Sequence, residues 1–347
     1  MQYVTTRCQD TFHDASITLT DNRGSDGGLF IPAVMPHFSE KQIMAMGEKS
    51  FAANVVEIIN LLFDTKLSSW SLEFAIGRYP VNLVSVSGRA TIAETWHNPA
   101  WKFDRLVRGV EKAIRQSDQI NPVPTDWLTI ASRTAVLFGI FGELIREGAV
   151  SFDNPMDVAV PSGDFSPVMA AWYAREWGLP IGNIICGSNE NPAAWNLLHK
   201  GELRTDVAVI ETQTPACDHT VPEDLERLIY HTLGLQELRR FLDACELKSN
   251  YYLERWQSEE LRKGIQVSVV SANRMKATMA SIYRTSNYIA EPYTALVYGA
   301  LIDVRSRMGV GRQTLILSEE SPAYSLGLIA GILGMDPMEV KKEIEKA

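Results

Sequence analysis

Residues 156–168, MDVAVPSGDFSPV, join a short apolar run to a loop of small residues and then to a helix that begins near Pro167. Such a loop directs several backbone N–H groups toward one point, and the helix N-terminus adds a partial positive charge, so the two together can bind a phosphate. The same residues also make an ordinary turn between a strand and a helix, because Ser, Gly and Asp favour turns and Pro favours the first helical turn. The stretch therefore predicts a β-to-α unit, with an anion site as one of two interpretations.

Similar units follow along the chain, because short apolar runs bounded by Gly, Pro or Asn alternate with longer stretches whose apolar residues have helical spacing. The predicted strands are residues 156–160, 181–186, 206–210, 267–270 and 313–317. The predicted helices are residues 168–177, 192–200, 223–233, 292–304 and 324–332. Parallel strands need crossover helices, and both of their faces are then buried. The pattern predicts an α/β fold with a mostly parallel sheet and helices on both faces.

The first third of the chain has a different pattern. It contains a strand-like run, VNLVSVSG, followed by a helix, and the segment NPVPT at residues 121–125 is rich in proline. Proline clusters of this kind are typical of breaks between structural units. We therefore predict a smaller N-terminal domain at residues 1–125 and a large α/β domain at residues 126–347.

Composition and charge exclude several classes of function. With 33 basic and 42 acidic residues the net charge is -9, so a general attraction to nucleic acid or to an anionic membrane is not expected. The four cysteines form no CxxC pair and the histidines have no metal-like spacing, so no metal site is predicted. No basic segment followed by an apolar stretch opens the chain, and no run approaches the roughly 18 apolar residues of a membrane span. We expect a soluble cytoplasmic protein.

A lysine lies among aromatic residues in the segment WHNPAWKFDR, residues 96–105. In a partly desolvated pocket the pKa of Lys102 is lowered, and its amine can then form a Schiff base with an aldehyde cofactor. Alternatively, Lys102 is a surface residue whose aliphatic stem lies across Trp101 or Phe103.

Two further segments carry charged residues whose role the pattern leaves open. In LERLIY, residues 225–230, Glu226 and Arg227 either bind a charged substrate or form the solvated face of an amphipathic helix. In LSEESPA, residues 317–323, two carboxylates follow a strand, which is where open α/β sheets bind ligands, although Glu-Glu also starts ordinary helices.

The order of these motifs along the chain resembles the threonine synthase family. The opening segments YVTTR at residues 3–7 and SDGGLFIP at residues 25–32 are similar to that family's opening "Y-x-S/T-T-R... D-G-G-L-Y-V-P". ETWHNPAWKFDR is similar to the family's cofactor-lysine segment. An alignment with a two-residue deletion places Lys102 at the Schiff-base lysine, and an alignment without gaps places Asp104 there.

The resemblance also implies a set of binding residues. VPSGDFSPV is similar to the loop whose backbone holds the phosphate of pyridoxal phosphate (PLP), LTIASRTA at residues 128–135 contains a matching arginine, and LSEESPA replaces a family threonine near the pyridine nitrogen with a glutamate. The implied cofactor-binding residues are Ser162, Gly163, Asp164, Phe165, Ser166 and Glu319, and the implied substrate residues are Arg133 and Arg227.

For the whole chain, the resemblance implies PLP fold type II, similar to the tryptophan synthase β chain, with a reduced smaller domain because nothing like "T-S-G-D-T-G-S-A" follows the lysine region. The expected function is that of a PLP-dependent lyase acting on an amino acid or its phosphate ester, which is O-phosphohomoserine in the family. The alternative is a catalytically degenerate homologue that acts as a binding protein or has a PLP-independent activity. The expected partner is a small-molecule substrate, and the expected state is a monomer or a homodimer.

Overall fold

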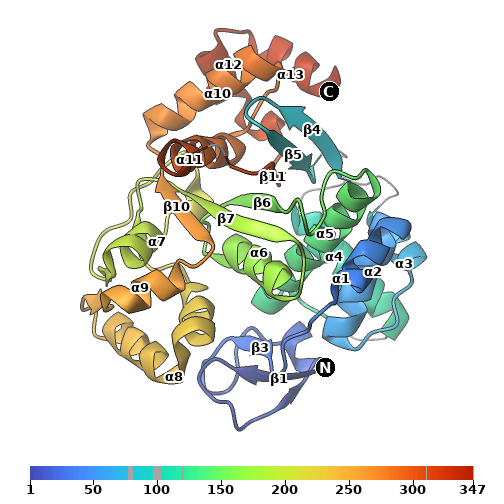
Figure 1. Cartoon of the computed structure of the whole chain (residues 1–347), viewed down its shortest axis with the longest axis vertical. Helices are drawn as coiled ribbons and strands as arrows, with labels where there is room; N and C mark the ends of the chain where they lie inside the picture. The colour runs from blue at the N-terminus through green and yellow to red at the C-terminus, as the bar shows by residue number, and fades with distance from the viewer. Residues whose placement is uncertain (77–80, 97–102, 119–120, 310, 347) are drawn as a thin grey trace.

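A six-stranded sheet forms the centre of the computed structural model, which describes residues 1–347 except 77–80, 97–102, 119–120, 310 and 347 (Figure 1). Its strand order is β10-β7-β6-β11-β5-β4. The strands are β4 Asn82–Val86, β5 Ala90–Glu94, β6 Met156–Pro161, β7 Ile181–Ser188, β10 Ile265–Val269 and β11 Thr314–Ser318. Only the β4–β5 pair is antiparallel within this sheet. The predicted mostly parallel α/β sheet is therefore confirmed.

Helices cover both faces of this sheet, each over its own hydrophobic core (Figure 1). On one face α6, Ser166–Glu176, packs between the sheet and α5, Asp126–Arg146, and α2, Phe51–Phe63, packs on α5. On the other face α11, Pro292–Met308, crosses the strands and carries α10, Ala272–Ser286. Because both faces are covered, the sequences of the strands are nearly continuous apolar runs.

The remaining elements surround this framework. The other helices are α1 Glu40–Ala45, α3 Ser69–Ile76, α4 Phe103–Asp118, α7 Ala193–Trp195, α8 Leu225–Glu246, α9 Arg255–Leu261, α12 Leu326–Leu333 and α13 Pro337–Lys346. The short helical turns are η1 Ile17–Leu19, η2 Met46–Glu48, η3 Asn196–Lys200, η4 Pro215–Cys217 and η5 Pro322–Ser325. Strands β8 Glu202–Leu203 and β9 Tyr251–Tyr252 form a small antiparallel pair.

The N-terminal segment forms a separate antiparallel sheet of β1 Gln2–Thr5, β2 His13–Asp14 and β3 Phe30–Pro32. Directly after β1, the Thr6 hydroxyl donates a hydrogen bond to the buried Glu226 carboxylate. Arg7 donates two more to the same carboxylate, over 3.2 Å from Nε and 2.9 Å from Nη2. The opening motif thus fastens the N-terminal sheet to the first turn of α8.

One predicted strand is wrong. Residues 206–210 have no regular structure, and the apolar side chains of Val207, Val209 and Ile210 are exposed. The backbone of Ile210 pairs instead with the side-chain amide of Asn191, through two hydrogen bonds of 2.8 Å. A side chain here takes the hydrogen bonds that a neighbouring strand would have supplied, so the alternating apolar pattern forms no ladder. The other four predicted strands are present within a residue or two of their predicted bounds.

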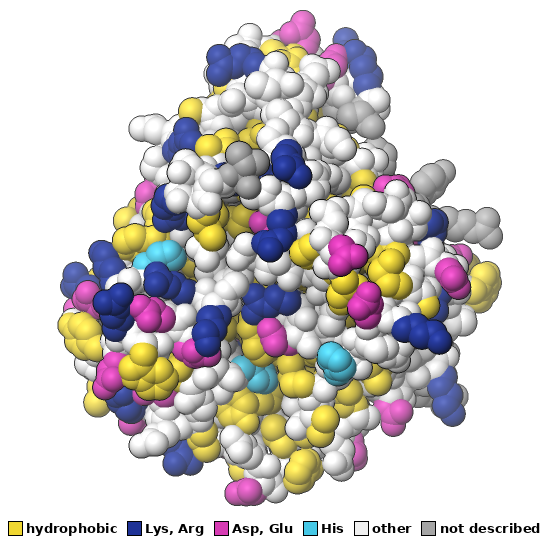
Figure 2. Space-filling view, viewed as in Figure 1, with side chains coloured by type: hydrophobic (Ala, Val, Ile, Leu, Met, Phe, Trp, Pro, Cys, Tyr) yellow, Lys and Arg dark blue, Asp and Glu magenta, His cyan; other side chains and the backbone are white. Residues whose placement is uncertain are grey.

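The predicted division at residue 125 remains a prediction, and the six-stranded sheet takes strands β4 and β5 from the N-terminal side of it. The helix that follows, α5, is long and apolar enough to cross a membrane by length and composition, although the sequence suggested no such run. In the fold, 78% of its most apolar window is buried, as in the core helix of a soluble protein. On the face shown in Figure 2, basic and acidic side chains are interspersed.

Candidate active site

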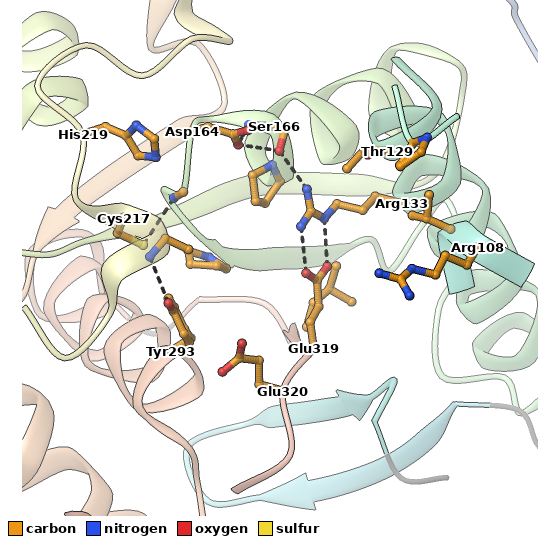
Figure 3. A pocket seen from close by; sticks show the side chains of 17 residues that line it. Arg108, Thr129, Arg133, Asp164, Ser166, Cys217, His219, Tyr293, Glu319 and Glu320 are labelled. Atoms are coloured by element: carbon orange, nitrogen blue, oxygen red, sulfur yellow. Dashed lines mark hydrogen bonds and ion pairs between the residues drawn. The ribbon is translucent and has the colours of Figure 1, made fainter. Parts of the chain in front are cut away.

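A cavity of about 640 Å³ opens where β6 and β11 end, beside the N-terminus of α6 (Figure 3). Its walls come from α4, α5, the loop after β6, the segment around η4, the start of α11 and the residues after β11. These segments are distant in sequence and meet because parallel strands place their carboxyl ends on one edge of the sheet. Ligands of open α/β sheets bind at such an edge.

The loop after β6 has most of its N–H groups satisfied inside the protein. The Ser162 N–H donates to the Gly187 carbonyl at 2.8 Å, and the Gly163 N–H donates to the Cys217 sulfur at 3.3 Å. Gly163 has φ of 50°, and a Cβ there would lie 3.3 Å from the Pro167 ring. This left-handed, crowded position favours glycine and leaves the backbone accessible from the cavity.

The N-terminus of α6 is capped by a carboxylate. Asp164 Oδ1 accepts hydrogen bonds from the Ser166 N–H at 2.9 Å and from the Ser166 hydroxyl at 2.5 Å. Phe165, between them, is fully buried and has φ of 76°, which is a costly conformation for a non-glycine residue. Pro167 adds no N–H donor. The helix end that would attract an external anion therefore already interacts with a negative group from its own loop.

An ion pair lies beside this cap. Arg133, from α5, donates from Nε and Nη2 to the two carboxylate oxygens of Glu319 at 3.0 and 2.9 Å. The third contact of its guanidinium is the Ser166 hydroxyl, 2.7 Å from Nη1. Both side chains are largely buried, with 14% and 20% of their surface exposed. The arginine and the glutamate predicted for separate roles are thus bound to each other.

Three aspartates gather on the far side of the loop. The carboxylates of Asp126, Asp164 and Asp224 lie within 4.8 Å of one another. Arg227 donates to Asp126 at 2.8 Å and to Asp224, and its Nε donates to the Phe30 carbonyl at 3.2 Å. Burial raises the pKa of Asp224 to about 8. Arg227 is fully buried in this cluster and is not part of the cavity wall.

The cavity is also lined by groups that the sequence did not indicate. Arg108 reaches it from α4 on the side of Glu319, whereas Cys217 and His219 come from the segment at η4 on the other side (Figure 3). The Tyr293 hydroxyl accepts a hydrogen bond from the Ala216 N–H at 3.0 Å, which ties α11 to that segment. Cys217 and His219 lie a few residues before the LERLIY segment at residues 225–230, whereas nothing in the sequence around Arg108 marked it.

The structure brings Arg133, Gly163, Asp164, Ser166 and Glu319 to one cavity. Ser162 and Phe165 are buried within the same loop, whereas Arg227 lies apart from the cavity. Asp104 lies in the first turn of α4, and Lys102 falls outside the described residues. The roles given to these residues remain predictions.

Comparison with known sequences and structures gives one consistent result. A family model described as "Threonine synthase N terminus" matches residues 2–78. Threonine synthase-like 1 from Homo sapiens is 26% identical over 240 residues, which cover 63% of this chain and 32% of that protein. Threonine synthase from Pseudomonas aeruginosa is 28% identical over 162 residues, which cover 45% of this chain and 34% of that protein. The chain thus matches about a third of the length of these relatives.

Solved structures agree in fold. A PLP-bound threonine synthase from Brucella melitensis superposes with a TM-score of 0.83 at 17% identity, covering 99% of this chain and 94% of that one. Threonine synthase from yeast gives a TM-score of 0.83 at 18% identity, covering 99% and 93%. The predicted PLP fold type II is therefore confirmed as the fold of this chain.

Proposed function

Because this chain belongs to the threonine synthase family, we propose that it is a PLP-dependent lyase acting on an amino acid or its phosphate ester. The observation that carries the proposal is the meeting, at one cavity, of the glycine loop after β6, the buried Arg133–Glu319 pair and the end of β11. We further propose a cytoplasmic protein, monomeric or homodimeric, with a small-molecule substrate.

The residues of the cavity fit the cofactor in two respects. A volume of about 640 Å³ lies within the usual range for small-molecule and cofactor sites, roughly 300 to 1,000 Å³. Gly163, where the space for a Cβ is restricted, lines the cavity as a residue of a phosphate-binding loop must, although its N–H already donates to the Cys217 sulfur. One feature acts against a phosphate, namely the Asp164 carboxylate at the start of α6. This conflict lowers the expected affinity without filling the cavity.

Each residue is assigned one task. The loop residues Ser162, Gly163, Asp164, Phe165 and Ser166 would hold the phosphate. Their backbone N–H groups would bind it only by exchanging internal partners such as the Gly187 carbonyl and the Cys217 sulfur. Glu319 would hold the ring nitrogen, with its carboxylate oriented by two hydrogen bonds from Arg133. Lys102 would anchor the cofactor and would move a proton at the substrate carbon. When bound, PLP supplies a ring that withdraws electrons from that carbon.

The alternative, a catalytically degenerate homologue, is not favoured by the comparisons. It predicts no cofactor binding, so one experiment separates the two. The full-length protein is incubated with PLP, its visible absorbance is recorded, and the complex is reduced with borohydride before peptide mapping by mass spectrometry. We expect an absorbance band that borohydride abolishes and a label on Lys102.

Lys102→Ala should lose the label, and Lys112→Ala, an exposed lysine on α4, should keep it. A protein that shows no band and no label with PLP would refute the proposed function. A label on another lysine would refute the assignment of Lys102 alone.

A further inference from the structure

We propose that Arg108 is the residue on which this cavity docks the carboxylate of its substrate. The assignment rests on the proposed function, since it names a specificity-determining residue of the same site. It replaces Arg133, which the sequence had indicated for substrate binding.

Arg133 already uses three of its five N–H donors, and the pair at Nε and Nη2 is occupied by a carboxylate. Its Nε and Nη2 are bound to Glu319 and its Nη1 to the Ser166 hydroxyl. A substrate carboxylate could reach it only by displacing Glu319, which would leave a largely buried carboxylate without its partner. Such an uncompensated charge is costly, so the pair is expected to stay closed.

Arg108 is in the opposite situation. Its side chain is exposed and lines the cavity, and Figure 3 shows it extending from α4 toward the end of β11, near Glu319. Within the described parts of the chain, no ion pair or hydrogen bond engages its guanidinium. Glu111, three residues further along α4, interacts with the Arg108 charge, which opposes the rise that burial causes in the pKa of Glu111, but no hydrogen bond joins the two side chains in the described parts of the chain. The planar fork of Arg108 is therefore available for bidentate recognition of a carboxylate.

The charges around the cavity favour a carboxylate over a phosphate at this position. Two guanidinium groups, Arg108 and Arg133, face the three carboxylates Asp164, Glu319 and Glu320. A phosphate dianion adds twice the negative charge of a carboxylate to a wall that is already negative on balance. A singly charged group bound to Arg108 therefore experiences less electrostatic repulsion from the lining carboxylates than a phosphate dianion would.

The test measures binding of propionate, which carries a single carboxylate, and of inorganic phosphate to the full-length protein by isothermal titration calorimetry at low ionic strength, where exposed charges are least screened. The variant is Arg108→Gln, and its control is Arg115→Gln, which removes an exposed arginine from the same helix outside the cavity wall. We expect propionate to bind the wild type and Arg115→Gln alike. Its affinity for Arg108→Gln should be about tenfold lower, as for the loss of one charge-assisted contact.

Three outcomes would overturn the proposal: equal propionate affinity in the wild type and Arg108→Gln, no propionate binding to the wild type, or phosphate binding that depends on Arg108 more strongly than propionate binding does. PLP absorbance is recorded on the same samples. Absence of the cofactor band together with Arg108-dependent propionate binding would refute the proposed enzyme while leaving the docking residue in place. A normal PLP band in the wild type together with unchanged ligand affinity in Arg108→Gln would refute the docking residue while leaving the proposed enzyme in place.

Discussion

Arg133 and Glu319 are 186 residues apart in sequence and are joined by two hydrogen bonds of 3.0 and 2.9 Å. The pair connects α5 to the residue that follows β11, and it lies against the capped start of α6 through Ser166. Three segments that form the cavity are therefore held together by one guanidinium group. The contacts that shape the site are also contacts that stabilise the fold.

The coupling within this pair can be measured with a double-mutant cycle of Arg133→Met and Glu319→Gln. Because the pair is largely buried, we expect a coupling free energy of about 1–3 kcal/mol in urea unfolding. The exposed Arg255–Glu259 pair on α9 is the control, and it should couple by less than about 0.5 kcal/mol. Equal coupling free energies in the two pairs would contradict the proposal that the Arg133–Glu319 pair holds these segments together.

Asp164→Asn should strengthen phosphate binding. The change keeps an oxygen that caps α6 and removes the negative charge beside the proposed phosphate position. We expect the affinity for inorganic phosphate and for PLP to rise by about tenfold, the scale of one unfavourable charge contact near a protein surface. Calorimetry measures both ligands, with the exposed Asp153→Asn as the control. An unchanged affinity would mean that Asp164 does not face the phosphate.

The pH dependence of stability should contain a contribution from Asp224. Burial raises its pKa from 3.8 to about 8, with Asp126, Asp164 and Arg227 as its charged neighbours. Between these two values the folded protein keeps a proton that the unfolded chain has released, so this contribution to the free energy of unfolding decreases as the pH rises and is level above about 8.

Asp224→Asn removes that titration. Urea unfolding between the two pKa values should show the wild type losing stability relative to the variant as the pH rises. If the free energies of unfolding of the wild type and Asp224→Asn change in parallel with pH, the raised pKa of Asp224 is contradicted. Asp153→Asn, which changes an exposed aspartate, should leave the wild-type slope unchanged.

The attachment of the N-terminal sheet should depend on the charge of Glu226. Glu226→Gln keeps the size of the side chain and weakens its hydrogen bonds to Thr6 and Arg7, so the free energy of unfolding should fall by about 1.5–3 kcal/mol. The neighbouring Glu223 pairs with Arg23 at the surface. Glu223→Gln should therefore cost less than about 1 kcal/mol. Similar losses in the free energy of unfolding in Glu226→Gln and Glu223→Gln would contradict the inference that burial makes the Glu226 contacts more stabilising.

Much of the fold could be predicted from local sequence, because buried parallel strands are continuous apolar runs and their crossover helices have regular spacing. The prediction of a strand at residues 206–210 was wrong because the backbone of Ile210 pairs with the Asn191 side chain, which no local pattern reveals. The helix predicted at residues 223–233 is shorter than the helix in the structure, because a glycine there bends the helix without ending it. Gly234, with φ of 83° and ψ of 177°, bends α8, and the helix continues beyond it to Glu246.

The site was harder to predict than the fold. The glycine loop, Arg133 and Glu319 belong to recognisable motifs, and the structure brings them to one cavity. Their pairing depends on two elements far apart in sequence, so the motifs alone suggested a free arginine and a free glutamate. Arg227 appeared to be available for substrate, whereas in the fold its guanidinium donates hydrogen bonds to Asp126 and Asp224. Arg108 was missed because an exposed arginine on an amphipathic helix has no local signature.

The contact between Thr6 and Glu226 spans 220 residues. During synthesis on the ribosome, residues 3–7 emerge long before their binding site on α8 exists, since the residues up to Glu226 must first be added. Tyr3 can already contact Leu62 and Trp127 at that stage, whereas Arg7 has no carboxylate from α8 to bind. The segment after β1 therefore waits for α8 before it reaches its native position, and a nascent chain stalled before α8 would expose it to proteases and chaperones.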